Sequence, residues 1–120
     1  QTILWWQRAA DQGFAPAQYT LGSLYREGLG VRRDLEKAAH WISRAADAGY
    51  PDAQYDYGVM HATGEGVKQD LSTAYMWLDL AVKQDSREAL KTRGLITKQL
   101  SPAEINEAEK RVANWKPTVP

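Results

Sequence analysis

The residues that could carry out acid–base or metal chemistry are few and scattered. The 120-residue chain has two histidines, His40 and His61, and no cysteine. Neither histidine has a second His or Cys at the spacing of a metal motif, so we predict no metal site and no cofactor. His61 is expected to be a partly buried packing residue. The absence of cysteine also excludes disulfides and thiolate nucleophiles.

The serines and glycines do not predict a catalytic or nucleotide site either. None of the serines lies in a nucleophile-elbow sequence. The glycine pairs at 28 and 30 and at 64 and 66 follow predicted helices rather than strands, and no Walker-type lysine follows them. The remaining carboxylates are expected on solvated helix faces. The sequence therefore predicts a protein that is not an enzyme.

Charge excludes some partners and leaves others open. Fifteen basic residues balance fifteen acidic ones, so no overall field favours nucleic acid or an anionic membrane. No apolar run approaches the ~20 residues of a membrane-spanning helix. Residues 49–84 carry two lysines against five carboxylates, whereas residues 85–120 carry two more basic than acidic groups. This asymmetry is either ordinary surface scatter, which we favour, or an acidic patch for a basic partner.

The elements that carry these residues repeat every 36 positions. Ala17-Gln18-Tyr19 returns as Ala53-Gln54-Tyr55, and partial copies stand at both ends of the chain. Other recurring pairs are Gly22 and Gly58, Gly28 and Gly64, Asp34 and Asp70, and Trp41 and Trp77, with Trp5 and Gly94 in the partial copies. A fixed period of this length predicts a stacked solenoid, which exposes long shallow surfaces suited to binding.

Each period predicts a pair of helices. Apolar residues recur at spacings of three and four on both sides of a glycine loop. Gly28 suits the left-handed position after the first helix, and Asp34 suits the N-cap of the second. A mid-helix glycine costs about 1 kcal/mol relative to alanine, so Gly22 and Gly58 predict close helix approach. Trp5, Trp41 and Trp77 are expected to fill the gaps between layers.

These residues carry a family resemblance over about residues 1–99. The pattern Leu-Gly-x-x-Tyr-x-x-Gly-x-Gly-Val-x-x-Asp, followed by Ala-x-x-Trp and Ala-Ala-x-x-Gly, resembles the Sel-one-like repeat, a relative of the tetratricopeptide repeat with a longer loop. It is read here at Leu21, Gly22, Tyr25, Gly28, Gly30, Val31, Asp34, Ala38, Trp41, Ala45, Ala46 and Gly49. The third copy is degenerate, because Leu100 stands in the place of Gly64.

The predicted fold is an all-α, right-handed superhelical solenoid of antiparallel helix pairs with a C-terminal capping helix. We divide it into the second helix of a truncated repeat (1–12), repeats at 13–48 and 49–84, the first helix of a degenerate repeat (85–99) and the capping helix (101–116). Ser101 and Glu104 have the spacing of a capping box. The tail that follows to Pro120 is expected to be mobile.

The source and the compartment follow less directly. The closing segment is similar to the ends of bacterial Sel-one-like repeat proteins, which implies a bacterial source, cytoplasmic or periplasmic. Because the chain begins inside a repeat, we expect it to belong to a longer protein. The open N-terminal edge, with Ile3, Leu4 and Trp6, is a candidate surface for self-association.

The resemblance implies a protein-interaction scaffold that binds a partner protein or peptide on its concave face. In tetratricopeptide-like solenoids the first helix of each pair lines that face. The candidate residues are Tyr19, Ser23, Arg26, Tyr55, Asp56, Val59, Lys91 and Leu95. Tyr19 and Tyr55 could equally serve as packing between repeats.

Two alternatives remain open. Some disulfide-rich bacterial members of the family were linked to penicillin binding and weak β-lactamase activity, but their repeats depend on cysteines, which this chain lacks. An accessory protein of the cell envelope or peptidoglycan, or a weak β-lactam hydrolase, is therefore the second interpretation. The third is a spacer inside a longer array, without a ligand of its own.

Overall fold

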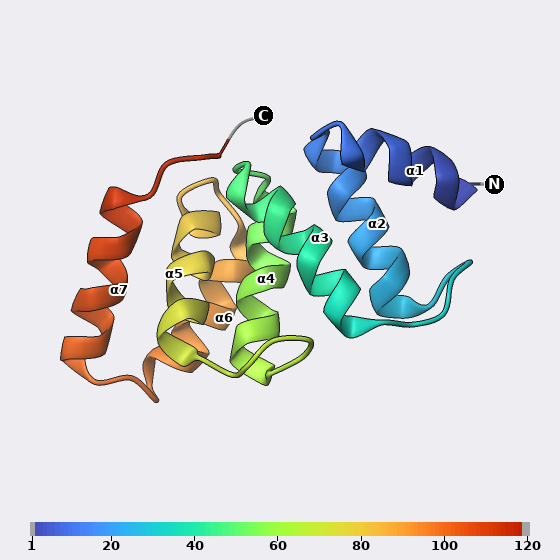
Figure 1. The fold of residues 1–120 in the computed structure, drawn as a ribbon. Helices are drawn as coiled ribbons and strands as arrows, with labels where there is room; N and C mark the ends of the chain where they lie inside the picture. The colour runs from blue at the N-terminus through green and yellow to red at the C-terminus, as the bar shows by residue number, and fades with distance from the viewer. Residues whose placement is uncertain (1, 119–120) are drawn as a thin grey trace.

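The computed structural model describes residues 2–118, and this part of the chain forms seven helices (Figure 1). They are α1 (Thr2–Asp11), α2 (Ala15–Glu27), α3 (Leu35–Asp47), α4 (Pro51–Thr63), α5 (Leu71–Val82), α6 (Arg87–Thr97) and α7 (Pro102–Asn114). Each of the helices α1 to α5 packs against the next, and α7 packs on α5, in an elongated array of 48 × 26 × 22 Å. The prediction of an all-α solenoid is confirmed.

Local signals begin and end the helices of both complete repeats. Asp34 caps α3 by accepting a hydrogen bond from the main-chain N of Lys37 at 3.0 Å, and Asp70 caps α5 through Thr73 at 3.1 Å. Gly28 adopts the left-handed conformation directly after α2. The loops 28–34 and 64–70 therefore turn the chain back, so that α3 lies along α2 and α5 along α4.

The mid-helix glycines allow the two helices of a repeat to touch. A methyl group on Gly22 would lie 2.6 Å from Cγ1 of Ile42, and one on Gly58 would lie 2.8 Å from Cγ of Leu78. Both distances are far shorter than a normal carbon–carbon contact. The predicted close approach is confirmed in both repeats.

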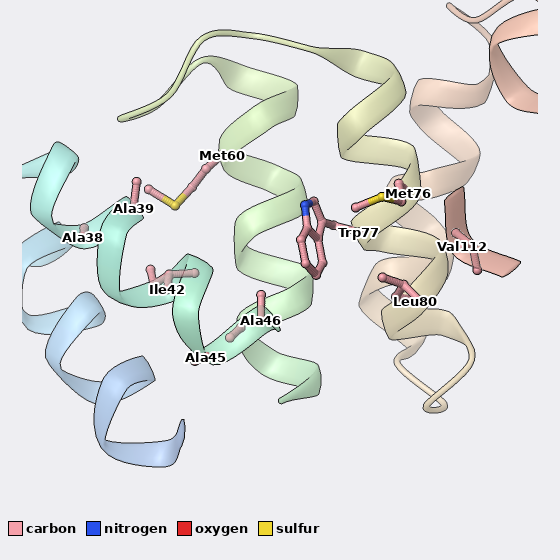
Figure 2. Close-up of a cluster of buried hydrophobic side chains, with 11 residues drawn as sticks. Ala38, Ala39, Ile42, Ala45, Ala46, Met60, Met76, Trp77, Leu80 and Val112 are labelled. Carbon is pink, nitrogen blue, oxygen red and sulfur yellow. The ribbon is translucent and has the colours of Figure 1, made fainter. Parts of the chain in front are cut away.

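The core lies between consecutive layers, and Figure 2 shows its largest cluster around Trp77. Trp41 and Trp77 are buried, as predicted. The expectation for Trp5 is wrong, because this side chain is 75% exposed. Trp41 packs among residues of the preceding helices, including Ala10 and Leu21. No helix precedes α1 within residues 2–118, so Trp5 has no equivalent layer against which to pack.

The last helix, α7, packs on α5 rather than along α6 (Figure 1). Its capping box is formed as predicted, by Ser101 and Glu104. The Tyr75 hydroxyl donates to Oε2 of Glu109 at 3.2 Å, and Ala108 is buried in the cluster around Leu78. The capping helix α7 thus covers α5 and leaves one side of α6 open.

The segment after α7 returns to the turn between α3 and α4. The ring of Trp115 lies 6.3 Å from that of Trp77, and the main-chain N of Thr118 donates to the carbonyl oxygen of Asp47 at 2.6 Å. The expectation of a mobile tail after residue 116 is therefore wrong for residues 117–118, because the bond from Thr118 anchors them. Residues 119–120 lie outside the described residues.

Candidate protein-interaction face

The first helices of the repeats lie near one another, since Arg26 of α2 reaches Asp56 of α4 and α4 contacts α6; we call the exposed sides of α2, α4 and α6 the first-helix face. All eight residues proposed from the sequence lie on these three helices. Ser23, Arg26 and Val59 are half-buried, whereas Lys91 is exposed and Leu95 is 65% exposed. Leu95 on α6 is thus the most exposed apolar side chain of the set.

Arg26 is engaged in a clamp between the two repeats. Its Nη2 and Nε donate to the two carboxylate oxygens of Glu65, at 2.8 and 3.3 Å, and its Nη1 lies 3.7 Å from Oδ2 of Asp56. Burial would lower the pKa of Arg26, but the bonds to Glu65 and the nearby carboxylates outweigh it and raise that pKa. A bidentate guanidinium is held in a fixed direction, so Arg26 joins α2 to the second repeat.

The carboxylate of Asp56 is partly buried beside this clamp. Burial raises its pKa, and Tyr19 and the Arg26 guanidinium oppose that rise. The pKa of Tyr19 is raised in turn, by burial and then by the charge of Asp56. With Asp52 and Glu65 close by, the centre of the first-helix face holds more negative than positive charge.

Tyr19 and Tyr55 both take part in packing. The Tyr19 ring lies 5.4 Å from the ring of Tyr50 and contacts the cluster around Trp77. Tyr55 contacts the cluster that includes Leu78. Their aromatic rings therefore hold neighbouring layers together, which leaves less of each ring for a partner.

The repeated glutamines each bind a carbonyl oxygen of the preceding helix, a role that was not predicted from the sequence. Gln18 donates to the carbonyl oxygen of Ala10 at 3.1 Å, and Gln54 donates to that of Ala46 at 3.3 Å. Gln84, just after α5, donates to Oε1 of Gln54 at 2.8 Å. The signal was the return of Ala-Gln-Tyr after 36 residues, because a buried polar side chain must find partners.

His61 is a packing residue, as predicted. Its ring lies 4.5 Å from that of Tyr57, and both ring nitrogens are buried without a hydrogen-bond partner. Burial lowers its pKa, although the carboxylate of Asp70 partly offsets this. Burial thus disfavours the charged imidazolium, and an acid–base role would require access to solvent or substrate that these buried nitrogens lack.

The described part of the chain offers little for other chemistry. Within residues 2–118, no three His, Asp or Glu side chains gather in a way that could hold a metal ion. No serine hydroxyl in this range is hydrogen-bonded to a His, Lys or carboxylate side chain. None of the helices described here has the length and apolar character needed to cross a membrane.

Three solved bacterial structures are similar to this fold. The Escherichia coli protein c5321, described as a protective antigen of uropathogenic strains displaying an SLR fold, is 31% identical, with a TM-score of 0.89 over 94% of this chain and 24% of that chain. This chain thus spans about a quarter of c5321. A Sel1 repeat protein from Oxalobacter formigenes is 38% identical, with a TM-score of 0.75 over 77% of this chain and 69% of that one.

The third structure shares the fold at lower identity. Cysteine rich protein B of Helicobacter pylori is 24% identical, with a TM-score of 0.72 over 75% of this chain and 68% of that one. A comparison with curated proteins finds no match. The model of the Sel1 repeat matches residues 1–14, 15–50 and 51–90. With its helix pairs, glycine loops and three matched repeat segments, the chain belongs to the Sel1 repeat family.

Proposed function

We propose that this chain is a scaffold module that binds a peptide segment of a partner protein across the first-helix face. Sel1 repeats generally act as non-catalytic protein-interaction scaffolds. The exposed sides of successive first helices in a solenoid make a long and shallow surface rather than a closed pocket. Such a surface suits an extended or helical peptide.

The observation that carries the proposal is the uneven charge along this face. Asp52, Asp56 and Glu65 surround the single guanidinium of Arg26 at its centre. The far end, on α6, exposes Lys91 and further basic side chains around Leu95. Complementary charge sets the orientation of a bound peptide and accelerates encounter. The preferred peptide is therefore basic where it crosses α4 and acidic where it reaches α6.

Photocrosslinking in the source bacterium tests this proposal. A photoreactive phenylalanine analogue is placed at Ser23 or Val59, on the first-helix face, and at His40, an exposed position of α3. We expect the same partner to be captured from positions 23 and 59 and not from position 40. Capture at all three positions, or at none, would contradict the proposal.

The control variant must leave the repeat clamp intact. Arg26 is unsuitable, because its replacement would break the bonds to Glu65 and alter stability together with binding. Asp52→Lys is better suited, since Asp52 is exposed in the first turn of α4 and makes no ion pair within residues 2–118. We expect this variant to lose most of the crosslinked product while its circular dichroism spectrum is unchanged.

A further inference from the structure

We propose that the open side of α6 binds an amphipathic helix of a partner protein, and that the flanks of this helix are acidic. The partner helix would take the place of the second helix that α6 lacks. This surface adjoins the end of the first-helix face that carries Lys91 and Leu95 but is distinct from it. It is the side of α6 marked by Leu90 and Gly94, which lie one helical turn apart.

In the first two repeats, this side of the first helix packs against the second helix of the same repeat. Gly22 packs against Ile42 of α3, and Gly58 packs against Leu78 of α5. A methyl group added to either glycine would lie closer to that side chain than a normal contact distance. Gly94 stands one period after Gly58. A methyl on Gly94 would have nothing within 4 Å. This position thus contacts a second helix in the first two repeats and is uncovered on α6.

Leu90 shows the same vacancy one turn earlier. At the equivalent place, Gln54 is fully buried, between Ala46 of the preceding repeat and Gln84 at the end of its own second helix. The side of Leu90 that corresponds to the Gln84 side of Gln54 is uncovered, and Leu90 is 50% exposed. Leu95 on the adjoining side is exposed as well. Leu90 and Gly94 therefore form the uncovered apolar strip on α6, and the basic side chains of Arg87 and Lys91 separate this strip from Leu95.

The chain's own last helix does not fill this strip, for two reasons. The loop before α7 has four residues (98–101), whereas the loops 28–34 and 64–70 have seven. In addition, Lys110 and Asn114 stand one period after Ala74 and Leu78, the two residues of α5 nearest to Gly58. A polar pair cannot replace an apolar pair at a close contact without loss of hydration. The apolar stripe of α7 instead covers α5.

Charge around the strip indicates the kind of helix that fits. Arg87 and Lys91 on α6, and Lys98 directly after it, are exposed and take part in no ion pair within residues 2–118. Glu88 is the one carboxylate on this helix, and Arg93 is occupied by Asp79. A partner helix with leucine and alanine on one side and Glu or Asp on its flanks would bury the strip and meet these cations.

A synthetic peptide provides the probe. It is about 20 residues long so that it is helical on its own. It carries alanine and leucine four residues apart, as at Ala74 and Leu78 of α5, with glutamate on both flanks. The matched control has lysine in place of every glutamate. Titration of the isotope-labelled chain, followed through its amide NMR signals, reports both the affinity and the place of binding.

We expect the acidic peptide to shift the amide signals of Leu90 and Gly94, with little change at Gly22. It should bind at least about tenfold more tightly than the lysine control, and salt should weaken it. Gly94→Ala should reduce the affinity about tenfold or more, because the added methyl would meet the incoming side chain, as it would at Gly58. The same variant should be no less stable than the native chain, so lost binding cannot be ascribed to unfolding.

Three results would overturn the inference. They are the absence of saturable shifts with the acidic peptide up to about 1 mM, equal affinity for the two peptides, and unchanged affinity of Gly94→Ala. Shifts confined to Ser23 and Val59 would likewise reject the α6 site while supporting the first-helix face. Conversely, shifts at Gly94 combined with failed crosslinking at positions 23 and 59 would reject the proposed face alone.

Discussion

The two glycines Gly58 and Gly94 should respond in opposite directions to the same substitution. Alanine is favoured over glycine inside a helix by about 1 kcal/mol, in part because glycine loses more backbone freedom on folding. At Gly94 the new methyl meets nothing within 4 Å, so Gly94→Ala should gain most of this difference. For a chain of this size that corresponds to a rise in Tm of roughly 2–4 °C.

At Gly58 the gain is outweighed by overpacking. The methyl of Gly58→Ala would lie 2.8 Å from Cγ of Leu78, 3.1 Å from its Cδ2 and 3.2 Å from the carbonyl oxygen of Ala74. Forcing a methyl group into a filled helix interface costs ~1–3 kcal/mol. After subtraction of the helix preference, the free energy of unfolding should fall by up to about 2 kcal/mol.

Urea unfolding followed by circular dichroism at 222 nm measures both variants against the native chain, with the slope m as a check that the denatured state is unchanged. Opposite signs would support the helix contact in the second repeat and the open side of α6. Stabilisation by both substitutions would refute the tight contact at Gly58. Destabilisation by both would refute the open side of α6.

Three further substitutions test other contacts. Because burial lowers the pKa of His61 from 6.5, the unfolded chain binds its proton more readily, and stability is lost as pH falls below about 6.5. His61→Phe should reduce this loss of stability, measured by urea unfolding between about pH 7.5 and 5. An unchanged dependence of stability on pH would contradict this prediction. Arg93→Met leaves the buried carboxylate of Asp79 with only the distant amine of Lys83 and should lower the free energy of unfolding in urea by about 2–3 kcal/mol. Adding Asp79→Leu should recover part of this stability. A further loss in the double variant would argue against the ion pair. Ser101→Ala removes the cap of α7 and should lower the free energy of unfolding by about 1 kcal/mol in a thermal melt, whereas an unchanged Tm would show that α7 is held without its cap.

Much of the fold could be predicted from the sequence because its signals are local and recur. Asp34 as an N-cap, Gly28 as a left-handed C-cap and the capping box at Ser101 each depend on residues within one turn. The 36-residue period then extends each local assignment to the next copy. Even the close contact at Gly58 followed from this recurrence, since a glycine that returns inside a helix needs a reason.

The candidate face was harder to predict, because its residues depend on neighbours far away in the chain. Arg26 was proposed as a binding residue, and the structure shows it held by Glu65, which lies 39 positions later. Trp5 shares its pattern with Trp41 but is exposed, since no layer precedes it within residues 2–118. Whether the eight proposed residues contact a partner remains a prediction.

By itself, the sequence determined the helix pairs, their caps, their period and the paucity of catalytic groups, since these depend on residue types and short spacings. Only the tertiary structure decided which faces are covered. It placed α7 on α5, returned the tail to Asp47 and left Leu90 and Gly94 open on α6. The physical reason is that helical periodicity marks a face as apolar, whereas the element that buries this face is selected by loop length and by side-chain fit between distant segments.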